Sequence, residues 1–284
     1  MLWTVHIEGG PQRVNHAAVC IGDKIYSFGG YCSTEEYKDW EPIPIHVLDT
    51  TTLRWAPVHY RKTHVMPFQR YGHTTVAYGD KVYMWGGRNN AVACDTLFCF
   101  DTKKLEWSKP AVTDTLKEEW IVANPQGPWP EGRRSHSAWY RQGYMYIFGG
   151  FNGNTKTHFN DLYRYSIIGN YWEYINVHGM KPCKRRRQAC ILYNDKVYLF
   201  GGTSPCPHVS GRPVDNADGL DDPERLIDNS DLHLLDYLPN LKTLCILQVL
   251  EHGLDQTFLP RDIIIDIRMM TLPNRISRPV NQAG

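Results

Sequence analysis

Four places along the first two thirds of the chain have arginine residues at similar spacing from a later motif. Two places are dense in cations, Arg133-Arg134-Ser135 and Lys184-Arg185-Arg186-Arg187, and two hold a single arginine, Arg13 and Arg70. Guanidinium groups bind carboxylates through paired hydrogen bonds, and hydroxyl or backbone donors add to them in a dry pocket. The whole chain has a formal net charge of +1. The clusters therefore predict a local site for an anionic group and not a general nucleic-acid-binding surface.

These arginines hold one position in a repeat that occurs four times. Each copy contains an apolar strand that ends in Gly-Gly, and the four strands are Lys24–Gly30, Lys81–Gly87, Tyr144–Gly150 and Lys196–Gly202. The first glycine of each pair lies 13 residues after a histidine or, in the last copy, a glutamine, namely His16, His73, His136 and Gln188. An arginine precedes each of these by three residues. Because the spacing recurs, we expect the four arginine positions to be structurally equivalent.

Each repeat continues with the features of a four-stranded antiparallel sheet. A strand that ends in Asp is followed six residues later by Trp in the first two copies, and Ser166 replaces the Asp in the third; the tryptophans are Trp55, Trp107 and Trp172. The two glycines permit a tight turn where a side chain would clash, and the Trp fills the space between neighbouring sheets. Such sheets arranged radially form a β-propeller. We therefore predict an all-β propeller with four recognisable blades over residues 1–236.

The period and the Gly-Gly and Trp pattern resemble the kelch repeat from Trp3 to Asp236. The fourth copy has no Trp after its last strand, which ends at Asp236. The segment from Trp3 to Pro11 is similar to the outer strand that begins at Trp172. We therefore predict that the N-terminal strand completes the last blade and closes the ring.

An irregularity lies between the second and third repeats. The spacing from Asp114 to Trp120 repeats the Asp-to-Trp spacing that has already ended repeat two, and Trp120 lies 13 residues before Arg133. We interpret this segment as the last part of a blade whose first part is missing, which predicts an internal deletion near residues 108–113. The alternative is a linker that contains Asp and Trp by chance. Members of the kelch family that the chain resembles look six-bladed, so four blades would leave strain or an open edge.

Residues 237–284 have a different character. The segment Leu241–Leu250 is apolar over most of a helical circumference, which predicts a helix with the propeller on one side and a partner on another. The segment Leu259–Ile267 has Pro260 at a helix-starting position and spaces its apolar residues by four, which favours a second helix. Its isoleucines suit a strand equally well by propensity.

These two segments resemble, in order, the box that binds Elongin C and the box that selects Cullin-2 in kelch-repeat substrate receptors of Cullin-2 ubiquitin ligases. The first resemblance is carried by Leu241, Cys245 and Val249, and the second by Leu259, Pro260, Ile263 and Ile267. The resemblance implies a non-catalytic subunit without a cofactor that bridges a substrate to Elongin B, Elongin C and Cullin-2 for ubiquitination and proteasomal degradation. It also implies recognition of the extreme C-terminus of the substrate, a C-terminal degron that is often a terminal glycine.

The arginine positions supply candidate residues for that terminal carboxylate. The residues that open the inner strand of each blade lie on one rim, so we predict substrate-binding roles for Arg13, Arg70, Arg133, Arg134, Ser135, Arg185, Arg186 and Arg187. For Arg13 and Arg70 the alternative of a brace within the blade is favoured. The other candidates include Arg134, Arg186 and Arg187, which are additional to the one arginine that every repeat has. The chain's own Gly284 is a further candidate ligand, unless the tail never reaches this rim.

Other kinds of chemistry find little support in the sequence. In Ser135-His136-Ser137 the neighbours point to opposite faces of a strand, which argues against a nucleophile and its base. The eight cysteines include no C-x-x-C pair. A zinc site that combines Cys206 and His208 with Cys183 and Cys190 fits no known structural spacing, so no metal site is predicted.

The N-terminus has neither a basic start nor an apolar run, so it does not resemble a signal peptide, and the longest apolar stretches are too short to cross a membrane. We therefore expect a cytoplasmic protein with access to the nucleus and without a membrane partner. The alternative function is that of a kelch scaffold that binds chromatin or cytoskeletal partners.

Overall fold

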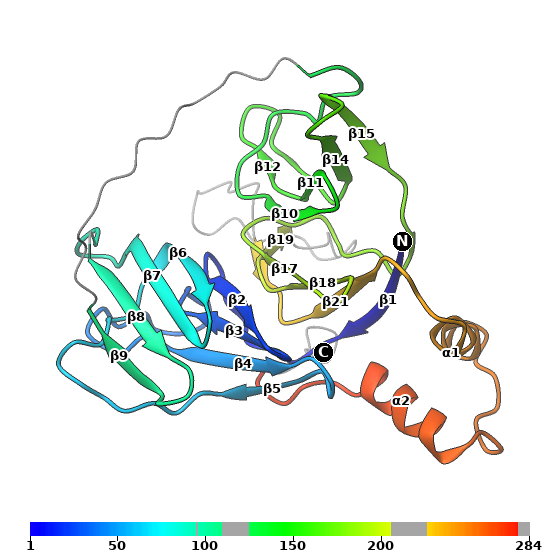
Figure 1. The fold of residues 1–284 in the computed structure, drawn as a ribbon, viewed down its shortest axis with the longest axis horizontal. Helices are drawn as coiled ribbons and strands as arrows, with labels where there is room; N and C mark the ends of the chain where they lie inside the picture. Colours follow the sequence, from blue (N-terminus) through cyan, green and yellow to red (C-terminus); the bar gives the residue numbers. More distant parts are fainter. Residues whose placement is uncertain (95, 110–124, 206–225, 278–284) are drawn as a thin grey trace, which may run out of the picture.

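Four antiparallel sheets stand around a common axis as the blades of a propeller (Figure 1). The computed structural model describes residues 1–94, 96–109, 125–205 and 226–277. Within these ranges strands predominate and α-helix is confined to two short segments, which confirms the predicted all-β propeller of four blades. Several predictions fall outside the described residues: residues 110–113 of the expected deletion point, the spacing from Asp114 to Trp120, the Cys206 and His208 ligands, and Gly284.

The blades are numbered by the chain order of their inner strands. Blade one consists of β2 (Ala17–Ile21), β3 (Lys24–Phe28), β4 (Ile45–Asp49) and β5 (Arg54–Pro57). Blade two consists of β6 (Tyr71–Tyr78), β7 (Lys81–Arg88), β8 (Leu97–Asp101) and β9 (Glu106–Ser108). Blade three consists of β10 (Ser137–Arg141), β11 (Tyr144–Phe148), β14 (Leu162–Ser166) and β15 (Tyr171–Ile175). Blade four consists of β17 (Ala189–Tyr193), β18 (Lys196–Phe200), β21 (Leu232–Asp236) and β1 (Leu2–Ile7).

Short strands extend two of the blades toward one rim of the ring. In blade three β12 (Phe151–Asn152) pairs with β13 (Thr157–His158), and in blade four β19 (Thr203–Pro205) pairs with β20 (Leu226–Asp228). A further strand, β16 (His178–Gly179), lies parallel to β1.

The outer strand of blade four comes from the start of the chain. β1 pairs antiparallel with β21, with Trp3 opposite Leu235. Trp3 is buried between blades three and four, where it meets Phe148 edge to face with 5.7 Å between the ring centroids. The prediction that the N-terminal strand completes the last blade is confirmed.

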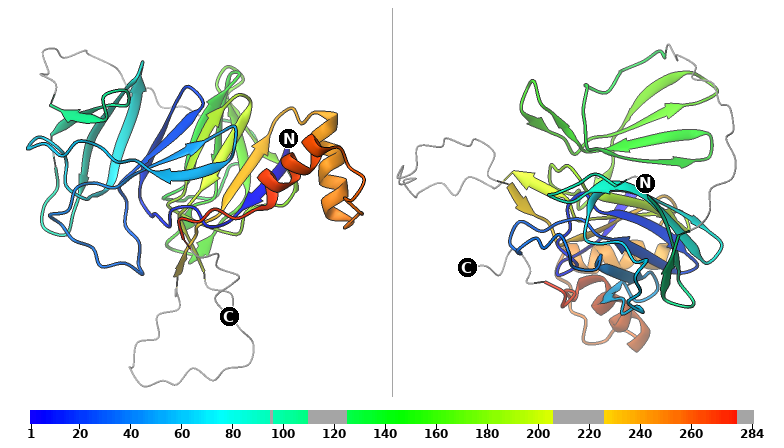
Figure 2. Two further views of the ribbon diagram at one scale, coloured as in Figure 1. Left: turned by 90° about the horizontal axis from the view of Figure 1, so that it is seen from below. Right: turned by 90° about the vertical axis from the view of Figure 1, so that its left-hand side faces the viewer.

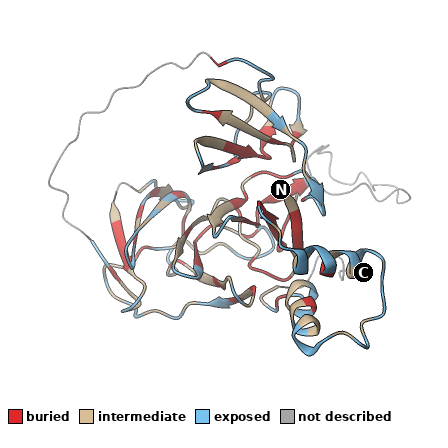
Figure 3. Cartoon of the chain, turned by 45° about the vertical axis from the view of Figure 1, so that its right-hand side comes forward, coloured by how far each residue is buried: buried red, intermediate tan, exposed pale blue. Residues whose placement is uncertain are grey.

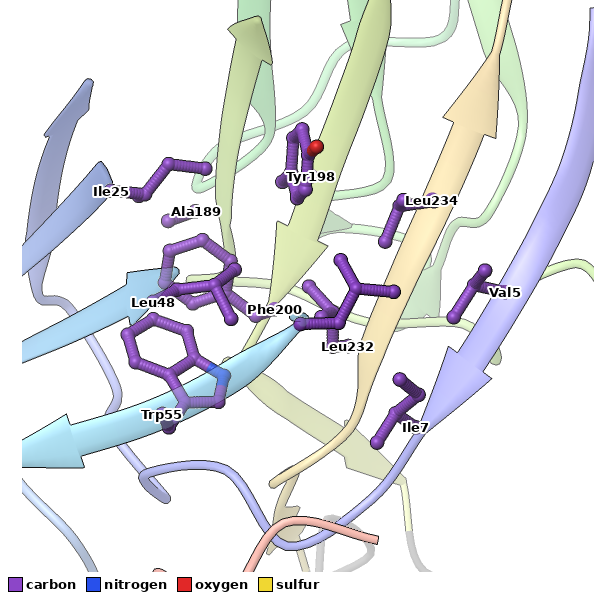
Figure 4. Close-up of a cluster of buried hydrophobic side chains, with 11 residues drawn as sticks. Val5, Ile7, Ile25, Leu48, Trp55, Ala189, Tyr198, Phe200, Leu232 and Leu234 are labelled. Carbon is purple, nitrogen blue, oxygen red and sulfur yellow. The ribbon is translucent and has the colours of Figure 1, made fainter. Parts of the chain in front are cut away.

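Three apolar clusters fill the spaces between adjacent blades. The cluster between blades four and one contains Phe200 and Trp55, which Figure 4 shows side by side. A second cluster joins blades one and two, and a third joins blades three and four. Within the described residues no such cluster joins blade two to blade three, and Figure 1 shows this side of the ring without a neighbouring sheet.

The Gly-Gly pairs are required because the next blade approaches them closely. The amide of Gly30 donates to the carbonyl oxygen of Arg70 in blade two at 2.8 Å. A Cβ placed on Gly29 would lie 2.6 Å from that same oxygen, and Gly29 has a φ of +58°, so both space and backbone exclude a side chain. The Gly-Gly motif is therefore needed for close contact between adjacent blades, in addition to the turn that it makes within its own blade.

Two helices lie outside the ring beside blade four (Figures 1 and 2). They are α1 (Leu241–Glu251) and α2 (Arg261–Thr271), so the first predicted helix is confirmed and the strand alternative for the second segment is wrong. Asn240 caps α1 by accepting a hydrogen bond from the amide of Thr243 at 2.8 Å, which satisfies one of the backbone donors in the first turn of the helix. No helix in the described ranges is long and apolar enough to span a membrane.

The repeat histidines predict how stability depends on pH. Burial lowers the pKa of His16 to about 4 and that of His73 to about 3. An unfolded histidine titrates near 6.5, so between these values the unfolded chain binds protons that the folded chain excludes. Stability is therefore complete above about pH 6.5 and falls as the pH drops toward 4, with a slope of up to about 1.4 kcal/mol per pH unit for each histidine.

Chemical denaturation at a series of pH values measures this slope, and the chain itself offers the control. Gln188 replaces the histidine in the fourth repeat, so His73→Gln introduces a side chain that the fold already accepts at the equivalent position. The variant should lose part of the pH dependence between 6.5 and 4. An unchanged slope would show that His73 does not control it.

Candidate functional site at the arginine-lined mouth and the external helices

The first arginine of each repeat is held by its own blade. Arg185 is fully buried and donates to both carboxylate oxygens of Asp231 at 2.6 Å, and it also donates to the carbonyl oxygen of Gly201. Arg133 forms the equivalent paired contact with Asp161 in blade three. The structure thus places these two predicted substrate-binding residues in ion pairs, where their guanidinium groups already have carboxylate partners.

The two single arginines also contact groups of their own blades. Arg70 is buried and donates to the carbonyl oxygens of Phe68 and Gly86 at 3.1 and 3.3 Å. Arg13 pairs with Glu35 at 2.8 Å. Both contacts lie within blade one or blade two and their loops, so they position the turns that lead into the inner strands.

The additional arginines of blades three and four converge on one aromatic ring. Arg134 is exposed and lies over Phe151 at 5.5 Å from the ring centroid, while the guanidinium of Arg186 lies over the same ring at 4.2 Å. Phe151 is itself buried. An anion placed near both guanidinium groups would be attracted by each of them.

Arg187 connects this cationic region to blade one. Its guanidinium donates to the Tyr31 hydroxyl at 2.8 Å, and its backbone amide donates to the carbonyl oxygen of Ser135 at 2.9 Å. Tyr31 meets Tyr71 edge to face at 5.4 Å, and Tyr71 meets Tyr37 in the same way at 5.8 Å. Burial raises the pKa of Tyr31, so its hydroxyl stays protonated and can donate to an anion at neutral pH.

A cavity of about 200 Å³ lies on the axis where the four inner strands begin. Every blade contributes to its lining through the repeat histidine or glutamine and the residue before it, and these preceding residues are Asn15, Gly72, Ser135 and Arg187. All four have positive φ, between +54° and +70°, which is uncommon for residues other than glycine. The cavity is smaller than a typical pocket for a drug-sized ligand and suits a small group such as a terminal carboxylate.

The structure therefore brings together part of the predicted set. Arg187 and Ser135 line the axial cavity, and Arg134 and Arg186 lie on the blade-three side of the same rim. Sequence analysis missed Tyr31 as a partner of Arg187. Its position directly after a Gly-Gly pair, which Phe151 shares, is the signal that could have identified both aromatic residues.

The residues of the first helical box lie mostly on the outside of α1. Leu241 is 76% exposed, and Leu244 and Cys245 are also exposed, whereas Ile246 is buried on the opposite side. Val249 is half-buried. Figure 3 shows exposed residues along both helices. An exposed leucine in the first turn of a helix that already has a buried side suits an anchor for a partner.

The residues of the second box are divided between the two sides of α2. Pro260 is exposed, and Leu259 and Ile263 are half-buried. Ile267, the last predicted Cullin-binding residue, is buried on α2, which packs against β1.

A cluster near Asp231 has residue types that could bind a metal ion. His6, Asp231 and His233 bring one ligand atom each within 4.8 Å of one another. The two histidine rings are stacked at 4.4 Å, and both oxygens of Asp231 already accept hydrogen bonds from Arg185. The geometry fits a buried polar network around an ion pair better than a coordination site.

The comparisons agree with this architecture. A family model described as the KLHDC2/KLHL20/DRC7 Kelch-repeats domain matches residues 2–202. The chain is 35% identical to kelch domain-containing protein 3 from Bos taurus and from Homo sapiens, over 98% of this chain and 98% of each relative. It is also 28% identical to an N-(sulfonatooxy)prop-2-enimidothioate sulfolyase from Thlaspi arvense, over 67% of this chain and 51% of that protein.

Kelch-repeat propellers are generally non-catalytic, and the repeats and relatives together support a kelch-type receptor or scaffold. The recurrent Gly-Gly pairs, the four sheets, the family model and the relatives over nearly the whole length all agree. The chain therefore belongs to the kelch-repeat family of β-propellers.

Proposed function

We propose that this chain is the substrate-recognition subunit of a Cullin-2 RING ubiquitin ligase and binds C-terminal degrons. The observation that carries the proposal is the exposure of Leu241 and Cys245 on a helix outside the ring, at the positions of an Elongin box. The axial cavity lies at the centre of the ring and the two helices lie outside it, so a substrate and a ligase subunit can bind at the same time. Such a bridging protein needs no catalytic residues of its own.

The experiment that tests the assembly is affinity purification of the intact chain from cells that contain the ligase subunits. Elongin B, Elongin C and Cullin-2 should be recovered in stoichiometric amounts, because an exposed apolar anchor favours a stable contact. Recovery of chromatin or cytoskeletal proteins without Elongin C would favour the scaffold alternative.

The proposed degron site consists of Arg134, Arg186 and Arg187 around the axial cavity, with Ser135 and Tyr31 as hydroxyl groups nearby. Arg133 and Arg185 stabilise the blades that carry these residues through their ion pairs with Asp161 and Asp231. A terminal glycine suits a cavity of about 200 Å³, because it leaves room for the carboxylate and adds no side chain.

A thermodynamic cycle predicts how this site responds to substitution. Arg134→Ala should weaken binding of a peptide that ends in a free glycine carboxylate by up to about 2–5 kcal/mol, the effect of removing one member of a charge pair that the bound peptide buries. Amidation of the peptide should produce a similar loss. If Arg134 contacts the carboxylate, the two changes together should cost little more than either alone.

Isothermal titration calorimetry with the free and amidated peptides measures all four corners of the cycle. Arg61→Ala is the matched control, because Arg61 is an exposed arginine on the loop after β5 that does not line the axial cavity. Equal affinity for free and amidated peptides would refute carboxylate recognition, while additive losses would place the carboxylate elsewhere.

In the part of the chain that the structure describes, no blade lies between β9 and β10, and we explain this as a loss of internal repeats. The alignment to kelch domain-containing protein 3 from Bos taurus runs over 383 positions, and 98% of 284 residues is about 278, so about 105 positions of that relative have no counterpart here. At about 50 residues per kelch repeat this difference equals about two blades. The side of the ring without a neighbouring sheet supports a place for them between blades two and three.

A further inference from the structure

Blade two has an apolar face without a neighbour in the described part of the chain. Val76 is 65% exposed, although Val19, three residues after the repeat histidine in blade one, is 7% exposed. Trp85 is 56% exposed, whereas its counterpart Phe28 is fully buried. Tyr83 pairs with Val76 across β6 and β7, so it lies on the same side. We call Val76, Tyr83 and Trp85 the blade-two open face.

Blade three has the opposite face uncovered. Tyr140 pairs with Met145, which pairs with Tyr165 and, through it, with Trp172, so these four side chains lie on one side of the sheet. Tyr140 is 62% exposed and Trp172 is half-buried, whereas Trp107, the counterpart of Trp172 in blade two, is buried against blade one. We call Tyr140, Met145, Tyr165 and Trp172 the blade-three open face.

We call the interface between two adjacent blades a seam, and the seam between blades two and three differs from the other three in its backbone contacts. At those three seams the amide of the second glycine of a pair donates a hydrogen bond to the carbonyl oxygen of the first arginine of the next blade. The three bonds run from Gly30 to Arg70, from Gly150 to Arg185 and from Gly202 to Arg13. Among the described residues no corresponding bond runs from Gly87 to Arg133. A Cβ on Gly86 would meet its nearest neighbour at 3.9 Å, against 2.6 Å at Gly29.

The two open faces are the two halves of one interface that the chain already forms three times. In each filled seam, the side that carries the Val19 and Phe28 positions packs against the side of the next blade that carries the Trp107 position. The blade-two open face is of the first kind and the blade-three open face is of the second kind. Each face therefore has its complement in the same sequence.

We propose that the blade-two open face of one copy packs against the blade-three open face of a second copy. The contact is heterologous, because each face matches the opposite kind and not itself. It would cover Val76, Trp85 and Tyr140, and it would provide the missing seam bond from Gly87 to Arg133 of the next copy. A heterologous contact leaves one face of each kind at the ends, so it closes into a ring or continues as a chain of copies.

The experiment uses the full chain and two single substitutions. Val76→Glu introduces a charge on the first face and Tyr140→Glu on the second, both at side chains that are mostly exposed in the single copy. Sedimentation velocity should show that the unmodified chain associates to at least twice the monomer mass. Each variant should associate at least about tenfold more weakly, because a charge without a partner would be buried in the contact.

The decisive sample is an equimolar mixture of the two variants. Val76→Glu retains an intact blade-three open face and Tyr140→Glu retains an intact blade-two open face, so the mixture should form a one-to-one complex and nothing larger. Trp40→Glu, on the loop after β3, is the matched control and should associate like the unmodified chain, because Trp40 is exposed but lies on neither face.

Three outcomes would overturn the proposal. An unmodified chain that remains monomeric over a wide dilution series would show that the faces are covered within one copy. Association that survives both substitutions would place the contact elsewhere. A mixture that does not restore association would exclude a heterologous contact. If either variant fails to fold, the emission of Trp85 can be obtained as the difference between the fluorescence spectra of the unmodified chain and of Trp85→Phe. This emission should shift to shorter wavelength as the protein concentration rises, because Trp85 becomes buried. An emission wavelength that stays constant would refute the burial of Trp85.

Discussion

Leu241→Ala is expected to abolish co-purification of Elongin C with this chain and to leave the propeller folded. Leu241 is 76% exposed, so its side chain contributes little to the stability of the chain alone. A large apolar residue that anchors an interface, in contrast, often accounts for 2 kcal/mol or more of the binding energy, by order of magnitude about a 30-fold change in affinity. Quantitative pull-down with Elongin B and Elongin C, together with a thermal melt of the variant, measures both effects.

The control for this prediction lies three residues earlier in the chain. Leu238 is 70% exposed and precedes the box, so Leu238→Ala removes a similar exposed side chain outside the proposed contact. It should retain the recovery of Elongin C. Equal recovery of Elongin C with the unmodified chain, Leu241→Ala and Leu238→Ala would refute the assignment of the box. Equal loss of Elongin C in both variants would indicate a wider or different binding surface.

Asp231→Ala is expected to destabilise the propeller by about 3–5 kcal/mol, because it leaves the buried guanidinium of Arg185 without its carboxylate partner. Asp231 also accepts a contact from His233 at 3.0 Å, so the substitution disturbs a network and not one pair. Denaturant unfolding monitored by tryptophan fluorescence gives the free energy of unfolding.

Asp161→Ala is the matched comparison in blade three. Its carboxylate pairs with Arg133 at the equivalent place, but the side chain of Asp161 is more exposed than that of Asp231. Water can therefore solvate the remaining arginine in part, and the loss should be smaller. Equal losses at the two positions would show that burial does not determine the strength of these ion pairs.

The effect of Asp231→Ala should depend on pH. Burial alone would raise the pKa of Asp231, but the charge of Arg185 and its hydrogen bonds outweigh burial and hold the pKa well below its usual range. A carboxyl with a lowered pKa in the folded state stabilises the fold above its unfolded pKa of about 3.9 and loses that contribution as the pH falls. The difference between the variant and the unmodified chain should therefore shrink below about pH 4.

The spacing of Gly-Gly pairs and tryptophans was sufficient to predict the blades and the role of β1. These features record packing between neighbouring sheets, which every repeat must provide. The ion-pair partners of Arg133 and Arg185 could not be predicted, because Asp161 and Asp231 lie 28 and 46 residues away at places where the repeats differ in length. Only the folded loops bring them together.

The candidate site was predictable in its cations and not in its aromatic residues. Arg134 and Arg187 stand out because they are additional to the one arginine that every repeat has. Tyr31 is one of 17 tyrosines, and only its contact with Arg187 of the neighbouring blade singles it out. The open seam could not be predicted from the sequence of blade two, because Gly86 and Gly87 form the same motif as the Gly-Gly pairs of blades that have a neighbour. The motif shows that a blade has a surface suited to a neighbouring blade, but only the three-dimensional structure shows whether that neighbour is present.

The origin of β1 at the start of the chain affects how the protein is made. Leu2 pairs with Asp236, so blade four cannot be completed until more than 230 residues have left the ribosome. At about 5–20 residues per second, this delay is about 10–50 s. Trp3, Val5 and Ile7, which are buried in the finished blade, remain without their partner strand throughout this time. Blades one and two can form first, and a chaperone that binds the nascent β1 segment would protect the strand that must wait for the last blade.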